Sequence, residues 1–291
     1  MKNILITNAD RVVGANLAAV LAEDYRVVAV GSTAASVAGC GAATVKLTDA
    51  LSVRRLLAAE APDVIIHCST SAASGWNAAQ ETSDDARCVE NLSSAAKATD
   101  AKMVLVTGDQ VFRGPWLFHS EESECLADTQ PAQDALACEK MVRGVPGGLV
   151  LRTRVVGWSP TGRGELESML DDLEIGADFG FGHHATPIGA TRFSEIVAGS
   201  LDYDLAGIFN VGGAERCSAF GFASALARQF DLPRPVSSDS DVANETSLRS
   251  NLICRTLQVT LPTVNETAAE LEFEHDDRRI AFAALPAARA A

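Results

Sequence analysis

The sequence has few cations, few aromatic side chains and no long hydrophobic run. It carries 24 Lys and Arg against 38 Asp and Glu, a formal net charge of −14 at pH 7. A surface this acidic repels phosphate backbones and anionic lipid, which argues against nucleic acid and membranes as partners. No apolar stretch approaches the roughly 20 residues that span a bilayer, and no leader cleavage site precedes the first apolar run. We therefore expect a cytoplasmic protein.

Paired cysteines and clustered metal ligands are also missing. The seven cysteines are odd in number, scattered and free of any Cys-x-x-Cys pair, so we expect reduced thiols, mostly in the core. His183 and His184 lie near Asp178, but no further ligand follows at metal spacing, and we expect no metal site. Tyrosine occurs only twice, at Tyr25 and Tyr203.

Strand-like and helix-like segments alternate through the first half of the chain. Strands are expected at Asn3–Thr7, Arg26–Val30, Val45–Leu47, Val64–Cys68, Met103–Thr107 and Gly148–Thr153. Helices are expected at Leu17–Ala22, Val53–Glu60, Ala86–Thr99 and Ala132–Arg143. This alternation predicts βαβ crossovers and an α/β fold, a Rossmann-like doubly wound parallel sheet covered by helices on both faces.

The pattern changes after Thr153. A glycine-laden loop is expected at Gly176–Gly189, and helices at Glu165–Leu173, Phe193–Leu201 and Phe220–Phe230. We predict a Rossmann-like nucleotide-binding domain over residues 1–153. A small C-terminal α+β lobe of the substrate-binding type, interleaved with the last sheet strands, is predicted over 154–275. The Arg- and Ala-rich residues 276–291 are expected to be a frayed tail.

The turn after the first strand is where a nucleotide-binding α/β fold carries three glycines, the middle one admitting a pyrophosphate to the helix N-terminus. The three positions here are Asn8, Arg11 and Gly14, so only the last glycine survives. Asp10 places a negative charge where the phosphates would lie, although Arg11 offers a guanidinium to them instead. We expect weak or absent NAD(P) binding. The residues expected to contact such a cofactor are Asn8, Arg11, Val12, Val13, Gly14, Cys68 and Ser69.

Two further features bear on that site. Cys68 and Ser69 follow the fourth strand, at the crevice where this fold binds ligands, and small side chains there either leave room for a ribose or simply pack a strand end. The second strand ends in Gly31-Ser32-Thr33, with no acidic residue for a ribose diol. NAD and NADP therefore stay equally open as cofactors.

Four strings are informative together: P-D-V-I-I-H at 62–67, T-G-D-Q-V-F-R-G at 107–114, L-R-T-R-V-V-G at 151–157 and G-I-F-N-V-G-G at 207–213. In sequence and in order they resemble strings of the extended short-chain dehydrogenase/reductases, and within them of dTDP-4-dehydrorhamnose reductase and its sugar-nucleotide-binding relatives. The resemblance covers roughly Met1 to Leu271. It implies NAD(P)H-dependent reduction of a 4-keto sugar nucleotide, with a Ser or Thr positioning the substrate and a Tyr-x-x-x-Lys pair moving the proton.

The catalytic side chains implied by this resemblance are missing. Gly108 stands at the Ser/Thr position, Pro131 at the tyrosine position and Ala135 at the lysine position. A different alignment of the loop 115–131 is the alternative, although L-A-C-E-K at 136–140 fits the family string closely. We therefore expect a catalytically inactive member that keeps the fold and a nucleotide-sugar or partner-binding role. The alternative is an active NAD(P)H-dependent sugar-nucleotide reductase with a non-standard proton donor.

The resemblance also implies substrate contacts and partners. Asp109 and Phe112 belong to the matched string at 107–114, and Phe112 either floors a sugar pocket or packs in the core. Arg249, in a segment similar to part of the substrate lobe, is expected to contact a phosphate, with a surface salt bridge as the alternative. Because members of the family often form dimers, a homodimer or a regulatory protein partner is expected by analogy.

Overall fold

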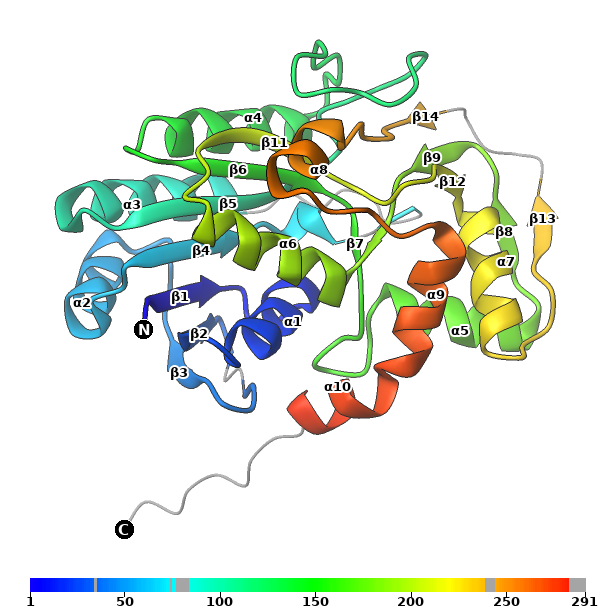
Figure 1. Cartoon of the computed structure of the whole chain (residues 1–291), viewed down its shortest axis with the longest axis horizontal. Coiled ribbons are helices and arrows are strands. Elements are labelled where there is room, and N and C mark those ends of the chain that lie inside the picture. The colour runs from blue at the N-terminus through cyan, green and yellow to red at the C-terminus, as the bar shows by residue number, and fades with distance from the viewer. Residues whose placement is uncertain (34–35, 74, 77–83, 239–243, 283–291) are drawn as a thin grey trace.

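Seven parallel strands form one sheet in the order β11-β6-β5-β4-β1-β2-β3 (Figure 1). The computed structural model describes residues 1–33, 36–73, 75–76, 84–238 and 244–282. The strands are β1 (Asn3–Thr7), β2 (Arg26–Gly31), β3 (Gly41–Thr44), β4 (Val64–Cys68), β5 (Lys102–Gly108), β6 (Leu149–Thr153) and β11 (Gly207–Val211). The strand order reverses beside β1, which is the doubly wound topology, so the predicted fold class is confirmed.

Helices cover both faces of this sheet. One face carries α1 (Val12–Leu21), α6 (Ala190–Asp202) and α8 (Asn251–Leu257), and the other carries α2 (Ala50–Glu60), α3 (Asp85–Thr99) and α4 (Gln130–Arg143). Successive strand side chains point to opposite faces. Ile4 and Ile6 therefore pack in the cluster with α1 and α6, whereas Leu5 packs with α2 and α3. Both faces are buried, which is why the strands are apolar throughout.

A smaller α+β lobe stands at the carboxyl ends of these strands (Figure 1). Its helices α5 (Glu165–Ile175), α7 (Ala219–Gln229) and α9 (Val264–Phe273) surround a separate apolar cluster that includes Trp158 and Phe222. Its short strands are β7 (Val155–Val156), β8 (Asp178–Gly180), β9 (His183–Ala185), β10 (Ile188–Gly189), β12 (Cys217–Ser218), β13 (Val236–Ser238) and β14 (Asn244–Glu245). Between the lobe's segments the chain returns to the main sheet with α6 and β11.

Two segment predictions need correction. The third strand is Gly41–Thr44 rather than Val45–Leu47, and it runs along the exposed edge of the sheet, where strand residues need not be apolar. The stretch Gly176–Gly189, expected as a loop, contains the three short strands β8, β9 and β10. These strands have only two or three residues, too few for an alternating pattern to be visible.

The prediction of a frayed tail from Asp276 is wrong for its first residues, which belong to the helix α10 (His275–Phe282). The Arg278 guanidinium donates to the Thr191 hydroxyl at 2.7 Å, and the Ala38 backbone N–H donates to the Ala281 carbonyl at 2.9 Å. These contacts anchor the helix on α6 and on the segment before β3. Residues 283–291 of the predicted tail lie outside the described residues.

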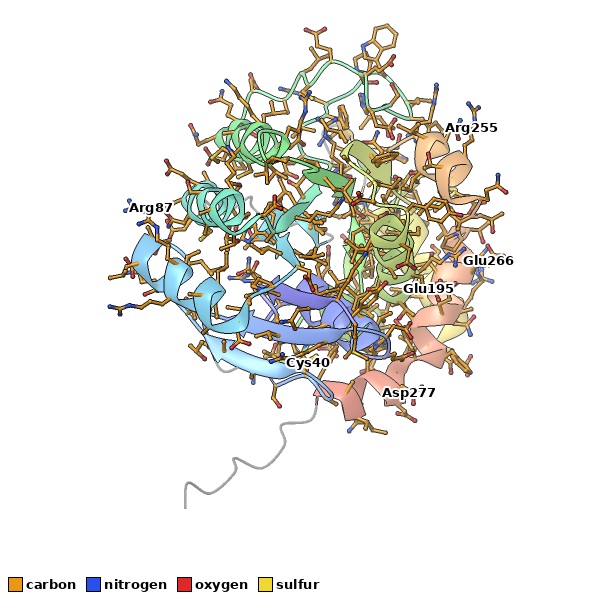
Figure 2. All side chains as sticks on the ribbon, turned by 60° about the vertical axis from the view of Figure 1, so that its left-hand side comes forward. Cys40, Arg87, Glu195, Arg255, Glu266 and Asp277 are labelled. Atoms are coloured by element: carbon orange, nitrogen blue, oxygen red, sulfur yellow. The ribbon has the colours of Figure 1, made fainter. Side chains whose placement is uncertain are left out.

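Charged side chains project outward from the helical layers, as Figure 2 shows for Arg87, Glu195, Arg255, Glu266 and Asp277. All five are exposed. Within the described ranges, no helix combines the length and apolar character needed to cross a membrane.

The close approach of α1 to the β1–α1 turn depends on Gly14. A Cβ at this position would come within 2.7 Å of the Asn8 carbonyl carbon and 2.9 Å of the Ala9 nitrogen. We expect Gly14→Ala to lower the free energy of unfolding by about 1–3 kcal/mol, as measured by urea denaturation, because helix and turn must separate. The control is Gly41→Ala, whose Cβ would meet its neighbours at an ordinary 3.7 Å. An equal loss in both variants would contradict this role.

Candidate functional site

The turn after β1 keeps a tight phosphate-loop shape although two of its three glycines are replaced. Asn8 has a left-handed backbone (φ 54°), which asparagine tolerates better than most residues, and its Nδ2 donates to the Cys68 carbonyl at 2.7 Å. The Arg11 backbone N–H closes the turn on the Asn8 carbonyl at 3.0 Å. Asn8 therefore adopts the left-handed conformation that a glycine at this position would supply.

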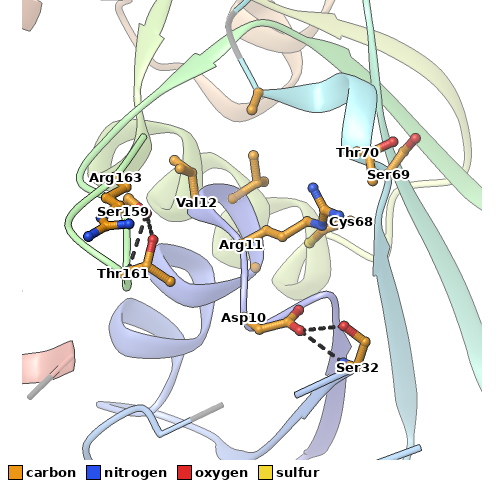
Figure 3. A pocket seen from close by; sticks show the side chains of 13 residues that line it. Asp10, Arg11, Val12, Ser32, Cys68, Ser69, Thr70, Ser159, Thr161 and Arg163 are labelled. Atoms are coloured by element: carbon orange, nitrogen blue, oxygen red, sulfur yellow. Dashed lines mark hydrogen bonds between the residues drawn. The ribbon is translucent and has the colours of Figure 1, made fainter. Parts of the chain in front are cut away.

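A cavity of about 300 Å³ opens at the N-terminus of α1 (Figure 3). That volume lies at the lower end of the range for small-molecule sites. Of the seven residues expected at a cofactor site, all but Asn8 line the cavity, and Asn8 holds the turn behind it. The complete lining is Asp10, Arg11, Val12, Val13, Gly14, Ser32, Cys68, Ser69, Thr70, Ala73, Ser159, Thr161 and Arg163.

Two guanidinium groups and a helix N-terminus give this cavity a positive character. Figure 3 shows the Arg11 side chain reaching toward Cys68, with Arg163 on the other side beside Ser159 and Thr161. The side chain of Arg11, at the N-cap of α1, makes no capping bond, and the first turn of the helix holds no acidic residue. The first backbone N–H groups of α1 and the helix dipole therefore favour an anion in the cavity.

Asp10 is turned toward the end of β2. Its Oδ2 accepts hydrogen bonds from the backbone N and the hydroxyl of Ser32, at 2.9 and 2.8 Å, and from those of Thr33, both at 3.1 Å. Burial acts to raise the pKa of Asp10, but these bonds outweigh it and lower the pKa below its usual value. The carboxylate is therefore fixed at the end of β2, a strand whose own end carries no acidic residue. Its effect on a phosphate in the cavity stays a prediction.

The residues after β4 form a hydrogen-bonded frame. Ser69 Oγ donates to the Asp85 carboxylate at 2.5 Å, and the Thr70 N–H and hydroxyl donate to it at 3.0 Å. Burial acts to raise the pKa of Asp85, but the neighbouring His67 and these bonds outweigh it and lower the pKa well below its usual range. Burial raises the pKa of the Cys68 thiol far above its usual value. Cys68 is therefore a neutral wall of the cavity rather than a nucleophile.

The positions that match the catalytic motif carry no group able to transfer a proton. Gly108 ends β5, and a Cβ there would overlap the backbone oxygen of Ser71 in the 3₁₀ helix η1 (Thr70–Ala72). Pro131 lies in the first turn of α4, and Ala135, one turn later, is buried. The space that a threonine side chain would take at Gly108 is thus filled by the Ser71 backbone and the Gln110 side chain.

A buried ion pair occupies the crevice beyond β5 and β6. The Arg154 guanidinium donates twice to Asp109, from Nε at 2.9 Å and from Nη2 at 2.7 Å, and lies 5.7 Å from the ring centre of Trp76. The Thr246 hydroxyl donates to the same carboxylate at 2.9 Å, and His183 Nε2 lies 3.1 Å from that hydroxyl. Burial acts to lower the pKa of Arg154, but Asp109 outweighs it and raises the pKa. The pair links the sheet to β9 and to the segment after β14.

The other residues expected at a substrate site lie outside the cavity. The Arg152 guanidinium donates to Glu139 twice, at 2.7 Å, and stacks 5.0 Å over the ring of Phe112, which in turn stacks on His119. Phe112 is only 1% exposed, so it packs within the core. Arg249 is exposed on the segment before α8, where its backbone N–H donates to the His119 carbonyl. A role for Asp109, Phe112 or Arg249 in substrate binding stays a prediction.

Some residues of the site are not found by sequence reasoning. Ser159 and Thr161 line the cavity from a Gly- and Pro-rich stretch, and that composition is the only signal of their position. The contacts Asp10–Ser32 and Asp109–Arg154 join residues 22 and 45 positions apart, so no local sequence pattern indicates them. Among the described residues, no three His, Cys, Asp or Glu side chains are grouped so that they could hold a metal ion.

Removing one partner of the buried pair tests its contribution to stability. We expect Asp109→Ala to lower the free energy of unfolding by about 3–5 kcal/mol in urea denaturation, because the Arg154 charge stays buried without its partner. The double variant Asp109→Leu with Arg154→Met should be less destabilised than the single variant. Asp128→Ala removes the exposed 3.4 Å contact to Arg113 and should leave stability nearly unchanged. Equal effects of Asp109→Ala and Asp128→Ala would contradict the interpretation.

His183 makes stability depend on pH. Burial, with the Arg154 charge beside it, lowers the pKa of His183 to about 4, against an unfolded value near 6.5. The folded protein therefore binds this proton less readily than the unfolded chain does, and the stabilisation present above about pH 6.5 is lost as the pH falls toward 4. Between pH 7 and about pH 4.5 we expect a loss of roughly 2–3 kcal/mol more in the wild type than in His183→Gln. Equal losses of unfolding free energy in the wild type and in His183→Gln, measured by denaturant titration at both pH values, would refute this role of His183.

Comparisons with known proteins agree with the fold described above. The profile of the family described as "RmlD substrate binding domain" matches residues 1–267. No curated protein matches the chain in sequence. Among solved structures, dTDP-4-dehydrorhamnose reductase from Bacillus anthracis, in complex with NADP, superposes with a TM-score of 0.78 at 17% identity, covering 94% of this chain and 100% of that one.

Two further solved structures share the fold. A hypothetical dTDP-4-dehydrorhamnose reductase from Sulfolobus tokodaii has a TM-score of 0.75 at 23% identity, covering 92% of this chain and 99% of that one. The Bordetella bronchiseptica enzyme WbmH, in complex with NAD⁺, has a TM-score of 0.76 at 15% identity, covering 96% and 100%. The family resemblance drawn from the sequence motifs is therefore confirmed, and the chain belongs to the RmlD substrate binding domain family.

Proposed function

We propose that this chain is a catalytically inactive member of its family that retains a pocket for a nucleotide. Catalytic inactivity is supported above all by the packing at Gly108, which leaves no space for a side chain. Ser71 backbone stands where the substrate-positioning hydroxyl would project, while Pro131 and Ala135 stand where the tyrosine and lysine of the family would. General acid–base catalysis needs a titratable group within hydrogen-bond reach of the reacting oxygen, and these positions supply none.

The second half of the proposal is supported by the cavity at α1. Arg11, Arg163 and the helix N-terminus suit a phosphate, and hydroxyl groups of Ser69, Ser159 and Thr161 offer further donors. Relatives of this fold have been solved with NADP and with NAD⁺. At about 300 Å³ the cavity fits part of a dinucleotide rather than the whole. A bound NAD(P)H would supply hydride chemistry, but this chain's own residues would serve only to hold it.

The nucleotide-sugar ligand, the homodimer, the regulatory partner and the cytoplasmic location implied by the sequence stay predictions. The competing function is an active NAD(P)H-dependent sugar-nucleotide reductase that uses another proton donor. Both functions allow nucleotide binding, so only turnover separates them.

The direct test combines the chain with NADH or NADPH and a dTDP-4-keto sugar and follows absorbance of the reduced nicotinamide. We expect no oxidation above the rate without protein, while calorimetry detects nucleotide binding. Turnover that disappears on substitution of one residue of this chain would refute catalytic inactivity.

Restoring the motif side chains should not restore activity. We expect the triple variant Gly108→Thr, Pro131→Tyr, Ala135→Lys to stay inactive and to lose stability, because the threonine Cβ overlaps the Ser71 backbone. The double variant Pro131→Tyr, Ala135→Lys avoids that overlap and controls for it. It should remain folded and inactive, since the phosphate turn still carries Asn8 and Arg11 and hydride transfer needs a cofactor at near-attack distance. Brisk NADPH oxidation by either variant would show that the turn already holds a cofactor productively.

A further inference from the structure

The end of β2 is built as a cradle for a single anionic oxygen. Two backbone N–H groups and two hydroxyls, from Ser32 and Thr33, converge on Oδ2 of Asp10 at 2.8–3.1 Å. Gly31 makes room for this arrangement, because a Cβ there would lie 3.0 Å from Asp10 Cγ and 2.7 Å from the Thr33 carbonyl oxygen. The protein's own carboxylate thus occupies a site with the donor chemistry of a phosphate-binding site.

The same carboxylate is part of the ligand cavity. Asp10 and Ser32 line one side of it, and Arg163 with Thr161 line the other, with the start of α1 between them (Figure 3). Asp10 is partly exposed, and its lowered pKa keeps it ionised at neutral pH. A nucleotide whose diphosphate meets the α1 N-terminus would therefore present its ribose to a fixed negative charge.

We propose that Asp10 determines which nucleotide this pocket takes: a nucleoside diphosphate whose ribose keeps both hydroxyls free, and not one that carries a 2′-phosphate. This rests on the nucleotide pocket of the proposed function. A carboxylate accepts strong hydrogen bonds from a ribose diol. The same carboxylate repels a phosphate at this place. Because the donors of Ser32 and Thr33 already bind Asp10, they are not available to bind that phosphate. The residues at the end of β2 give no sign of this acid, because Asp10 comes from the β1–α1 turn.

The test measures the binding of NAD⁺ and NADP⁺, and of 5′-ADP and 2′,5′-ADP, by calorimetry. We expect the wild type to bind NAD⁺ at least tenfold more tightly than NADP⁺. Asp10→Gly frees the cradle and should shift that ratio at least tenfold toward NADP⁺, with 2′,5′-ADP gaining affinity over 5′-ADP. Asp10→Asn keeps the size of the side chain but removes the charge, so it should shift the ratio in the same direction by less.

Asp49→Asn is the matched control. Asp49 also accepts hydrogen bonds from a serine, from the Ser52 backbone N at 2.9 Å and its hydroxyl at 2.5 Å, but it caps α2 and does not line the cavity. The Asp49→Asn variant removes the same charge elsewhere on the surface and should leave the ratio of NAD⁺ to NADP⁺ affinity unchanged. Thermal unfolding of each variant verifies that it is folded.

The outcomes separate this inference from the proposed function. Equal or tighter binding of NADP⁺ by the wild type, or an unchanged ratio in both Asp10 variants, would overturn the role of Asp10. If the wild type binds no nucleotide, the retained pocket of the proposed function fails. The role of Asp10 is then tested by measuring the binding of 2′,5′-ADP to Asp10→Gly. Binding would support an anion site that Asp10 occupies in the wild type, and no binding would refute such a site.

Discussion

The buried pair of Asp109 and Arg154 is the interaction on which the crevice between sheet and lobe depends. Two charges removed from water are stable only when each satisfies the other, and here both guanidinium bonds are 2.9 Å or shorter. Thr246 and His183 complete the group from two segments of the lobe. The lobe is therefore fixed to the sheet by charge as well as by apolar contact.

The three positions that match the catalytic motif are built into the packing of backbone and side chains. Gly108 without a side chain lets η1 lie against the end of β5, where the Ser71 hydroxyl accepts a hydrogen bond from the Gly108 N–H at 3.3 Å. Pro131 is compatible with the first turn of α4, and Ala135 packs with Phe112 and Leu248. Each residue suits its present surroundings, so these three positions form consistent packed structure, which is the basis of the inactivity proposed above.

The sequence predicts the sheet well because its strands are buried on both faces. The bounds of β1 and β4 agree with the expected Asn3–Thr7 and Val64–Cys68, since an uninterrupted apolar run marks a central strand. The edge strand β3 is exposed and only weakly apolar, so the apolar residues that follow it, Val45–Leu47, give the stronger strand signal although they lie outside the strand. The site is harder to predict, because the bonds of Asp10 to Ser32 and of Asp109 to Arg154 are tertiary and depend on the topology being known first.

Gly14 matches the third glycine of the phosphate-turn motif, but this match does not by itself indicate a ligand. The contact with the Asn8 carbonyl requires glycine whether or not a phosphate binds. The case for a nucleotide therefore depends on features that packing does not need. Arg11 and Arg163 are cations of an acidic protein directed at one cavity, and Asp10 is an acid fixed at the end of β2 by four donors. Together they place positive charge at the helix N-terminus and negative charge at the end of β2, and the proposed discrimination between nucleotides rests on this arrangement rather than on any catalytic group.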